Sequence, residues 1–572
     1  MNKYIALTIG PIYRTMESCQ RTRMVWGASF LFSYLIRELT KLLKEGGCTV
    51  IIPCPDKIEC DTFKNGEGKY PDRILIQAKK GDFEKVQEAI NALLKVLAED
   101  IVGHLRNREP FKGNNKLTEK NVINDLKSYL QFYYIEKEIN EGDNALLSLY
   151  DDLDDLELRT CFLQNDENNF LFYYLFYLSI KNKTYSKPAQ AAFPDDKIDD
   201  FSIWKYGTWV LNSESGKYER IKRFPSLIEI STVSLAKLKF EEYNKLALKH
   251  IVEWEKHDPP NESPVEPQKN ENDFQDEFIL GLKEISQFKK FHQYFAVMYA
   301  DGDNIGSTLR KIGGNNKELK IFSEKLLDFN NDLVEIITNY GGAPVYLGGE
   351  DIFAFVPLVS LNEKQEVYNI MDLVRKIDEK FAQKFSKEYA QTLGVVQPCL
   401  SFGIAINYYK NPLNLTIKRA HELLGKAKSR KEKNAIELEL QEHTGQLFQL
   451  SVLKNNSESY RVMEELLKSL CSNVLKDEED EEDKKFINSI VHRLREPAFS
   501  ELLKLVAKDK YRLGEFFKQS FNEPIHRKKQ EYITAVEELV KTIFTDYDDE
   551  TSLQNIYAVL RLIDFMHKDI KD

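Results

Sequence analysis

Two pairs of acidic residues carry the clearest chemistry in this sequence. Asp301 and Asp303 end an apolar segment that predicts a β-strand. Glu350 and Asp351 lie between two short apolar runs that predict the strands of a β-hairpin. Because Mg²⁺ and Mn²⁺ prefer oxygen ligands, acids at a strand end and in a hairpin predict a divalent-metal site made by Asp301, Glu350 and Asp351. Two such ions would activate a hydroxyl group and neutralise the charge on a leaving pyrophosphate.

Two glycines, Gly348 and Gly349, come directly before the second acidic pair. Glycine accepts positive φ values and lets a phosphate approach the backbone, so we expect both to shape the turn and contact a nucleotide. The alternative for each acid taken alone is a solvated turn residue, and Asp303, beside Asn304, fits that alternative as well as it fits a site. The pairing of a strand end with a Gly-Gly turn favours the metal site for the other three acids.

Two further segments offer contacts for a nucleotide. Lys428 lies near the end of a basic segment that predicts a helix, and a lysine there would bind a triphosphate as a point charge. The alternative is a basic helix face in contact with solvent. Ser401 and Gly403 belong to a predicted buried strand, where small residues would leave room for a base or a ribose, the alternative being a plain core strand.

The elements that must position these residues follow a similar order in two parts of the chain. Residues 1–110 predict β-α-β-β-α, which is most of a ferredoxin-like domain. Residues 288–449 predict the same order around the acidic pairs, with one helix over residues 364–389. We therefore expect an α+β fold of two ferredoxin-like palm domains with these boundaries: a first palm at 1–110, a mainly helical domain at 111–287 that ends in a Pro-rich linker at 257–276, a catalytic palm at 288–449 and a helical domain at 450–572.

The composition excludes several classes of protein. A chain of 572 residues has room for about three to five domains, and 42% hydrophobic with 30% charged residues is typical of a globular protein. The net charge of −11 is the wrong sign for a broad nucleic-acid-binding face, so we expect RNA to meet a local patch or another subunit. No apolar run is long enough to cross a bilayer and no signal-peptide pattern opens the sequence, which predicts a cytoplasmic protein without membrane contact.

The seven cysteines form no recognisable metal or disulfide pattern. They include no CxxC pair, and the one cluster, Cys48, Cys54 and Cys60, is spaced more widely than the usual zinc spacing of about two to four residues. We expect reduced thiols and no zinc.

The motifs together resemble the palm of diguanylate cyclases, adenylyl cyclases and family B polymerases. More narrowly, the sequence resembles the large polymerase-cyclase subunit of type III-B CRISPR effector complexes, the Cmr type. The segments that carry this resemblance are spread over the chain: Ile9-Gly10-Pro11, Arg21-Thr22-Arg23, Trp26-Gly27-Ala28-Ser29, Leu31-Phe32-Ser33-Tyr34-Leu35, Tyr70-Pro71-Asp72-Arg73, Phe224-Pro225-Ser226, Gly348-Gly349-Glu350-Asp351, Leu400-Ser401-Phe402-Gly403-Ile404, and Ala427-Lys428 with Asn434.

The resemblance implies a subunit that works inside a complex with other proteins, guide RNA and target RNA. Capture of the target RNA would switch on a nucleotidyltransferase, or cyclase, that converts ATP into cyclic oligoadenylate and releases pyrophosphate. This product would be a second messenger in antiviral defence. By position, the resemblance assigns the metals, the turn and the phosphate contact to residues named above: Asp301, Glu350 and Asp351 for the metals, Gly348 and Gly349 for the turn, and Lys428 for the phosphates.

Three features depart from the family pattern. His257-Asp258 is the only His-Asp pair, and the two prolines after it would end a metal-binding helix, so we expect neither an HD nuclease domain nor DNA cleavage. The cysteine-rich zinc module that often precedes the catalytic palm is missing. Glu350 replaces the first aspartate of the common Gly-Gly-Asp-Asp hairpin; it keeps the charge but reaches one methylene further, which preserves metal binding and leaves the choice of substrate open.

Two alternatives remain open from the sequence. Some relatives without the nuclease domain join AMP from ATP to S-adenosylmethionine, and nothing in the sequence excludes that co-substrate. The other alternative is a non-catalytic palm that acts as a scaffold, which Glu350 and the missing nuclease domain support. The presence of Asp301, Asp351 and Lys428 together favours catalysis, because a scaffold has no physical need for these charges.

Overall fold

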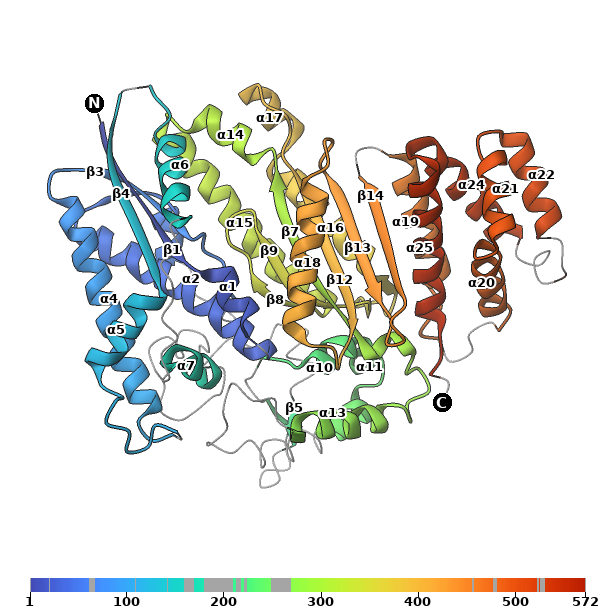
Figure 1. Ribbon diagram of the computed structural model, residues 1–572, viewed down its shortest axis with the longest axis horizontal. Coiled ribbons are helices and arrows are strands. Elements are labelled where there is room, and N and C mark those ends of the chain that lie inside the picture. The colour runs from blue at the N-terminus through green and yellow to red at the C-terminus, as the bar shows by residue number, and fades with distance from the viewer. Residues whose placement is uncertain are drawn as a thin grey trace.

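The computed structural model describes most of the chain as two sheets with their helices and a C-terminal group of helices (Figure 1). The expected Pro-rich linker at 257–276 lies mostly outside the described residues, and its described end begins helix α13 (Lys269–Leu282). The described residues are 2–19, 21–60, 67–108, 110–140, 142–158, 169–178, 209–211, 218–220, 224–247, 269–454, 457–476, 481–521, 524 and 530–570.

The first sheet is a complete ferredoxin-like domain. Its four strands lie in the order β2-β3-β1-β4, and β1 pairs antiparallel with both β3 and β4. The fourth strand was not predicted, because residues 115–255 read as mostly helical. Its side chains are mostly half-buried at the edge of the sheet, which weakens the strand pattern. The elements are β1 (Asn2–Gly10), α1 (Ile12–Glu17), α2 (Thr22–Glu45), β2 (Thr49–Ile52), α3 (Pro55–Cys60), β3 (Arg73–Ala78), α4 (Asp82–Leu105), α5 (Glu119–Tyr129) and β4 (Gln131–Ile139).

The second sheet repeats this order and extends it. Strands β8, β9, β7 and β12 lie side by side as β2, β3, β1 and β4 do in the first sheet, and β13 and β14 continue the sheet beyond β12. Helix α18 connects the parallel strands β12 and β13. The elements are β7 (Tyr294–Asp303), α14 (Ile305–Ile312), α15 (Asn316–Tyr340), β8 (Ala343–Tyr346), β9 (Ile352–Pro357), α16 (Ile370–Lys384), α17 (Lys387–Leu393), β12 (Cys399–Tyr408), α18 (Leu413–Lys428), β13 (Ala435–Gln441) and β14 (Leu447–Leu453).

Two details of the second palm differ from the sequence-based expectation. The single helix expected over residues 364–389 is wrong: the segment holds a short strand, β11 (Val367–Asn369), paired with β10 (Val359–Leu361), and then α16 and the start of α17. Asn369 caps α16 and Ser386 caps α17, so each side chain starts a helix where an uninterrupted helix was expected. Strand β14 also runs past residue 449, where we expected the palm to end.

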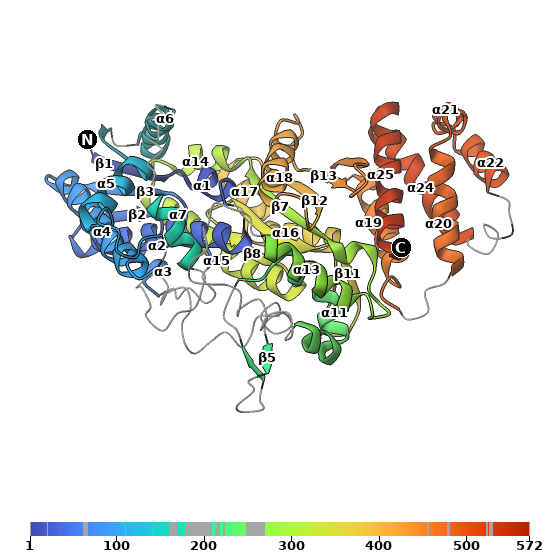
Figure 2. The same cartoon turned by 60° about the horizontal axis from the view of Figure 1, so that its bottom comes forward.

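The remaining described helices cover the sheets and form the C-terminal region, which lies beyond β14 in Figure 1 and at the end of the molecule opposite the N-terminus in Figure 2. None of the described helices is both long and apolar enough to span a membrane. The expected α+β fold with two ferredoxin-like domains and a helical C-terminal region is confirmed. The further elements are α6 (Ala145–Glu157), α7 (Phe170–Leu178), β5 (Trp209–Leu211), β6 (Tyr218–Arg220), α10 (Leu227–Ser231), α11 (Val233–Leu238), the 3₁₀ helix Lys290–Gln293, α19 (Glu458–Cys471), α20 (Glu481–Leu494), α21 (Pro497–Val506), α22 (Lys510–Ser520), α24 (Gln530–Asp546) and α25 (Asp549–His567).

Candidate active site

The turn between β8 and β9 lies against the end of β7. Strands β7 and β9 pair antiparallel with Ala300 opposite Ile352, so the residues after Ala300 run past the turn that precedes Ile352. Gly302 permits this close approach, since a Cβ there would lie 2.9 Å from the Cβ of Glu350. The topology therefore brings Asp301, on the strand, next to the acids of the turn.

Both glycines of the turn are required by its geometry, for different reasons. Gly349 has a φ of +68°, a value that residues with side chains rarely adopt. A Cβ on Gly348 would lie 2.0 Å from the hydroxyl oxygen of Tyr346, so no side chain fits there. The turn is closed by a hydrogen bond of 3.2 Å from the backbone N–H of Asp351 to the carbonyl oxygen of Gly348.

Lys428, the last residue of α18, reaches the end of β7. Its ammonium group forms an ion pair with Asp301 and donates to the carbonyl oxygen of Gly302 at 3.4 Å. Gly403 lets helix α18 lie close to β12. A Cβ at this position would come within 2.1 Å of the backbone nitrogen of Leu424. The space at Gly403 is therefore taken by the helix, as the plain core-strand alternative requires, and not by a base or a ribose.

The pKa values of Asp301, Glu350 and Asp351 are all raised, first of all by burial. Burial, followed by repulsion from Asp301, raises the pKa of Glu350 to about 7. Burial and repulsion from Asp301 and Glu350 raise the pKa of Asp351 well above its ordinary value. Burial also raises the pKa of Asp301, although the charge of Lys428 opposes this rise. Acids that disfavour each other's charge favour the binding of a cation between them.

Tyr13, on α1 of the first palm, reaches the hairpin, which no sequence pattern indicated. Its hydroxyl lowers the pKa of Asp351, although burial of Asp351 has the larger, opposite effect. The ring of Tyr13 lies 5.9 Å from that of Tyr346 and stacks on His421 of α18 at 5.8 Å. One residue of the first palm thus contacts the hairpin and the helix that carries Lys428.

The loop before β3 also fastens the first palm to the hairpin. The backbone N–H of Gly68 donates to the carbonyl oxygen of Val345 at 3.2 Å, and that of Leu347 donates to the carbonyl oxygen of Gly68 at 2.6 Å. Asp72 follows in the same loop; burial raises its pKa to about 6, and its charge contributes to the raised pKa of Glu350. In the sequence, Asp72 stands out only as part of Tyr70-Pro71-Asp72-Arg73, one of the segments that carry the family resemblance, and the sequence predicts no role for it.

Asp303 and Ser401 are engaged in bonds within the protein. Both are fully buried, and the Ser401 hydroxyl donates to Asp303 at 2.5 Å. The same oxygen of Asp303 accepts from the backbone N–H of Asn434 at 2.8 Å, and the Ser401 hydroxyl accepts from that of Ala435 at 3.2 Å. These bonds join β7 and β12 to the start of β13.

The donor chemistry of the site fits a hard divalent cation. Asp301, Glu350 and Asp351 offer carboxylate oxygens, which Mg²⁺ and Mn²⁺ prefer, and their raised pKa values would be relieved by a bound cation. In the described part of the chain, no group of three or more acidic, histidine or cysteine side chains is already arranged to hold a metal. Asp301 instead pairs with Lys428. The acids fit such a cation with nucleotide phosphates supplying further oxygen ligands.

Residues 294–437 match the family model of the second palm domain of Cas10/Cmr2. This stretch begins at β7 and ends within β13, and it contains all the residues of the second palm described above as acids, turn glycines and lysine. Comparison with curated protein sequences gave no match.

Chains of the type III-B Cmr-beta complex have a similar fold. A chain of the type III-B Cmr-beta complex in the apo state has a TM-score of 0.51 and 12% identity, over 91% of this chain and 77% of that chain. A chain of Cmr-beta bound to cognate target RNA has a TM-score of 0.50 and 12% identity, over 91% of this chain and 78% of that chain. A chain of a Csm1-Csm4 cassette in complex with AMPPNP has a TM-score of 0.46 and 12% identity, over 99% of this chain and 70% of that chain. The expected resemblance is confirmed by the family match of the second palm and by the fold shared with the Cmr-beta chains.

Proposed function

We propose that this chain is the large subunit of a type III CRISPR effector complex and that its second palm converts ATP into a nucleotide second messenger, cyclic oligoadenylate. The observation that carries this proposal is the meeting of Asp301, Glu350 and Asp351 with Lys428 inside a Cas10/Cmr2 palm. Carboxylates with raised pKa values beside the ammonium group of Lys428 suit a substrate that brings both metal ions and phosphates.

Each group has a distinct role in this proposal. Asp301, Glu350 and Asp351 would hold Mg²⁺ or Mn²⁺, which activates the attacking hydroxyl group and neutralises the charge on the leaving pyrophosphate. Gly348 and Gly349 would shape the turn that carries Glu350 and Asp351, because Gly348 has no room for a side chain and Gly349 has a positive φ. Lys428 would bind the triphosphate, and its pairing with Asp301 holds the ammonium group near the site in the nucleotide-free protein.

The partners in this proposal are other subunits of the complex, a guide RNA and a target RNA that switches synthesis on, in the cytoplasm. The fold shared with chains of Cmr-beta supports this placement. The net charge of −11 is consistent with a subunit that meets RNA mainly through its neighbours.

Consumption of ATP by the assembled complex tests the proposal. With Mg²⁺ or Mn²⁺, pyrophosphate release should require cognate target RNA and should be abolished by Glu350→Ala with Asp351→Ala, while assembly and RNA binding remain. The matched control is Glu464→Gln, which changes another partly buried glutamate with a pKa of about 7 outside this site and should leave the rate unchanged. ATP consumption that survives the hairpin variant would place the chemistry elsewhere, and ATP binding without turnover would favour a scaffold.

Transfer of AMP from ATP to S-adenosylmethionine is a second candidate. Glu350 leaves this reaction open, because its side chain reaches one methylene further than the aspartate of the common hairpin and so changes where a metal ion can lie. Both reactions use ATP and release pyrophosphate, so only the product distinguishes them.

A further inference from the structure

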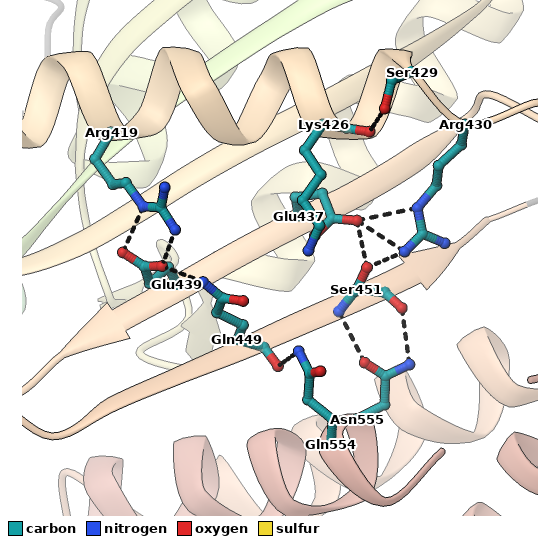
Figure 3. Close-up of polar contacts among 10 residues, drawn as sticks. All are labelled: Arg419, Lys426, Ser429, Arg430, Glu437, Glu439, Gln449, Ser451, Gln554 and Asn555. Atoms are coloured by element: carbon teal, nitrogen blue, oxygen red, sulfur yellow. Dashed lines mark hydrogen bonds and ion pairs between the residues drawn. The ribbon is translucent and has the colours of Figure 1, made fainter. Parts of the chain in front are cut away.

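Two sets of polar contacts join α18 to β13, β14 and the C-terminal helix α25 (Figure 3). Each set is centred on a buried glutamate of β13, either Glu437 or Glu439. A buried carboxylate costs free energy unless cations and hydrogen bonds satisfy it, and apolar residues would hold these layers together at a lower cost. A function other than stability would therefore explain why these two sets of contacts use buried glutamates.

Glu437 is fully buried and binds two cations that flank Lys428 in the sequence. The ammonium nitrogen of Lys426 lies 2.7 Å from Oε2 of Glu437, and Arg430 donates through Nε to Oε1 at 3.0 Å. Lys426 belongs to the last turn of α18, and Arg430 lies just beyond its end. The carboxylate of Glu437 thus binds one residue before and one residue after Lys428, the lysine that pairs with Asp301.

Ser451 of β14 and Asn555 of α25 extend these contacts to the C-terminal helices. The Ser451 hydroxyl donates to Glu437 and accepts from Arg430. The backbone N–H of Ser451 donates to Oδ1 of Asn555 at 2.9 Å, and its carbonyl oxygen accepts from Nδ2 of Asn555 at 2.8 Å. Buried hydrogen bonds therefore connect the end of α18 to α25 (Figure 3).

Glu439 repeats the arrangement farther from Lys428. It accepts from Arg419 of α18 at 2.8 Å and 2.5 Å and from Gln449 of β14 at 2.6 Å. Gln554 of α25 donates to the carbonyl oxygen of Gln449 at 3.2 Å. Arg419 lies roughly two and a half helical turns before Lys428. The two glutamates thus share their chemistry and differ in which part of α18 they hold.

We propose that Glu437 is a positioning residue for Lys428. By binding Lys426 and Arg430 it fixes the last turn of α18, and through Asn555 this fixation depends on the C-terminal helices. A lysine carries its charge on a flexible stem of four carbons, so the ammonium group is placed accurately only where its backbone is fixed. The effect on catalysis rests on the proposed function, in which Lys428 binds the triphosphate.

Acylation of lysines in the full-length, nucleotide-free protein tests the positioning directly. An amine-reactive acetyl ester is the probe, and mass spectrometry reads the labelling rate of Lys428. Glu437→Gln should raise this rate about tenfold, because the ammonium group leaves Asp301 more often. Glu439→Gln, which removes the same kind of ion pair near Arg419, should change it by less than about twofold. Equal rates in the two variants, or no rise in either, would overturn the proposal.

If Glu437→Gln does not fold, Ser451→Ala provides the same test of the proposal. It removes only the hydroxyl between Glu437 and Arg430 and should raise the labelling rate of Lys428 about threefold; an unchanged rate would contradict the proposal.

Steady-state kinetics of the assembled complex supply the functional readout. Glu437→Gln should raise the KM for ATP about tenfold with a smaller change in kcat. A merely structural defect would lower kcat through loss of active complex and leave KM unchanged, and this result would contradict the proposal. A wild-type complex that does not consume ATP would contradict the proposed function, and the labelling of Lys428 would still decide the role of Glu437.

Discussion

Replacing Glu350 by glutamine should stabilise the metal-free protein at pH 8. Burial and repulsion from Asp301 raise the pKa of Glu350 from 4.5 to about 7. Between these pH values the folded state binds more protons than the unfolded state, so stability falls as the pH rises through this range. Above pH 7 the full cost of ionising Glu350 is present, and below pH 4.5 it is absent. Glutamine fills the same space without the charge.

The size of the effect follows from the same pKa values. A rise from 4.5 to about 7 corresponds to about 3 kcal/mol of unfolding free energy at pH 8. At pH 5 the difference between Glu350→Gln and the wild type should shrink to less than about 1 kcal/mol. Mg²⁺ should stabilise the wild type more than the variant, because a ligand that binds only the folded state raises its stability and the variant has lost one carboxylate.

Thermal unfolding at pH 5 and pH 8, with a chelator or with Mg²⁺, measures these differences. Glu464→Gln is the matched control, because burial raises the pKa of Glu464 to about 7 as well, away from the hairpin. The control should show the same pH-dependent stabilisation and keep the full response to Mg²⁺. The reasoning is refuted if Glu350→Gln gives the same shift at both pH values, or if Mg²⁺ stabilises it as much as the wild type.

Three further changes test other parts of the site. Gly348→Ala should destabilise the palm by about 2 kcal/mol or more and abolish ATP turnover, because the added Cβ would lie 2.0 Å from the hydroxyl of Tyr346; unchanged thermal unfolding would contradict the described turn. Tyr13→Phe should move the acidic limb of the pH–rate profile upward by about one pH unit, because the hydroxyl of Tyr13 lowers the pKa of Asp351 and its removal lets this pKa rise; an unshifted profile would show that Tyr13 does not act on Asp351. Lys428→Met should raise the KM for ATP by about tenfold or more in steady-state assays, and an unchanged KM would remove Lys428 from the nucleotide site.

The local parts of the site were readable from the sequence because neighbouring residues define them. An apolar strand ending at Asp301 and a Gly-Gly turn before Glu350 have strong short-range patterns, and the structure has the strand and the turn where these patterns predict them. The repeated strand and helix order likewise predicted both palms. Boundaries at helix caps were less visible, as Asn369 shows by starting α16 within an expected helix.

The parts that the sequence did not reveal depend on contacts between distant segments. Tyr13 meets Asp351 only because the two palms pack together, and nothing in its neighbourhood marks it as functional. The glutamates of β13 gave no signal either, since Glu437 becomes a buried ion-pair centre only when α18, β14 and α25 surround it. Strand β4 lies at a sheet edge with mostly half-buried side chains, so its pattern was weak.

Mass spectrometry of the products tests the central claim most directly. The assembled complex is incubated with cognate target RNA, Mg²⁺ or Mn²⁺ and ATP, with and without S-adenosylmethionine, beside the variant that carries Glu350→Ala and Asp351→Ala. The account predicts cyclic oligoadenylate in both wild-type reactions and none with the variant. An adduct that forms only with S-adenosylmethionine would replace the cyclase by an AMP transferase, and the absence of any product made from ATP would contradict catalysis by this palm.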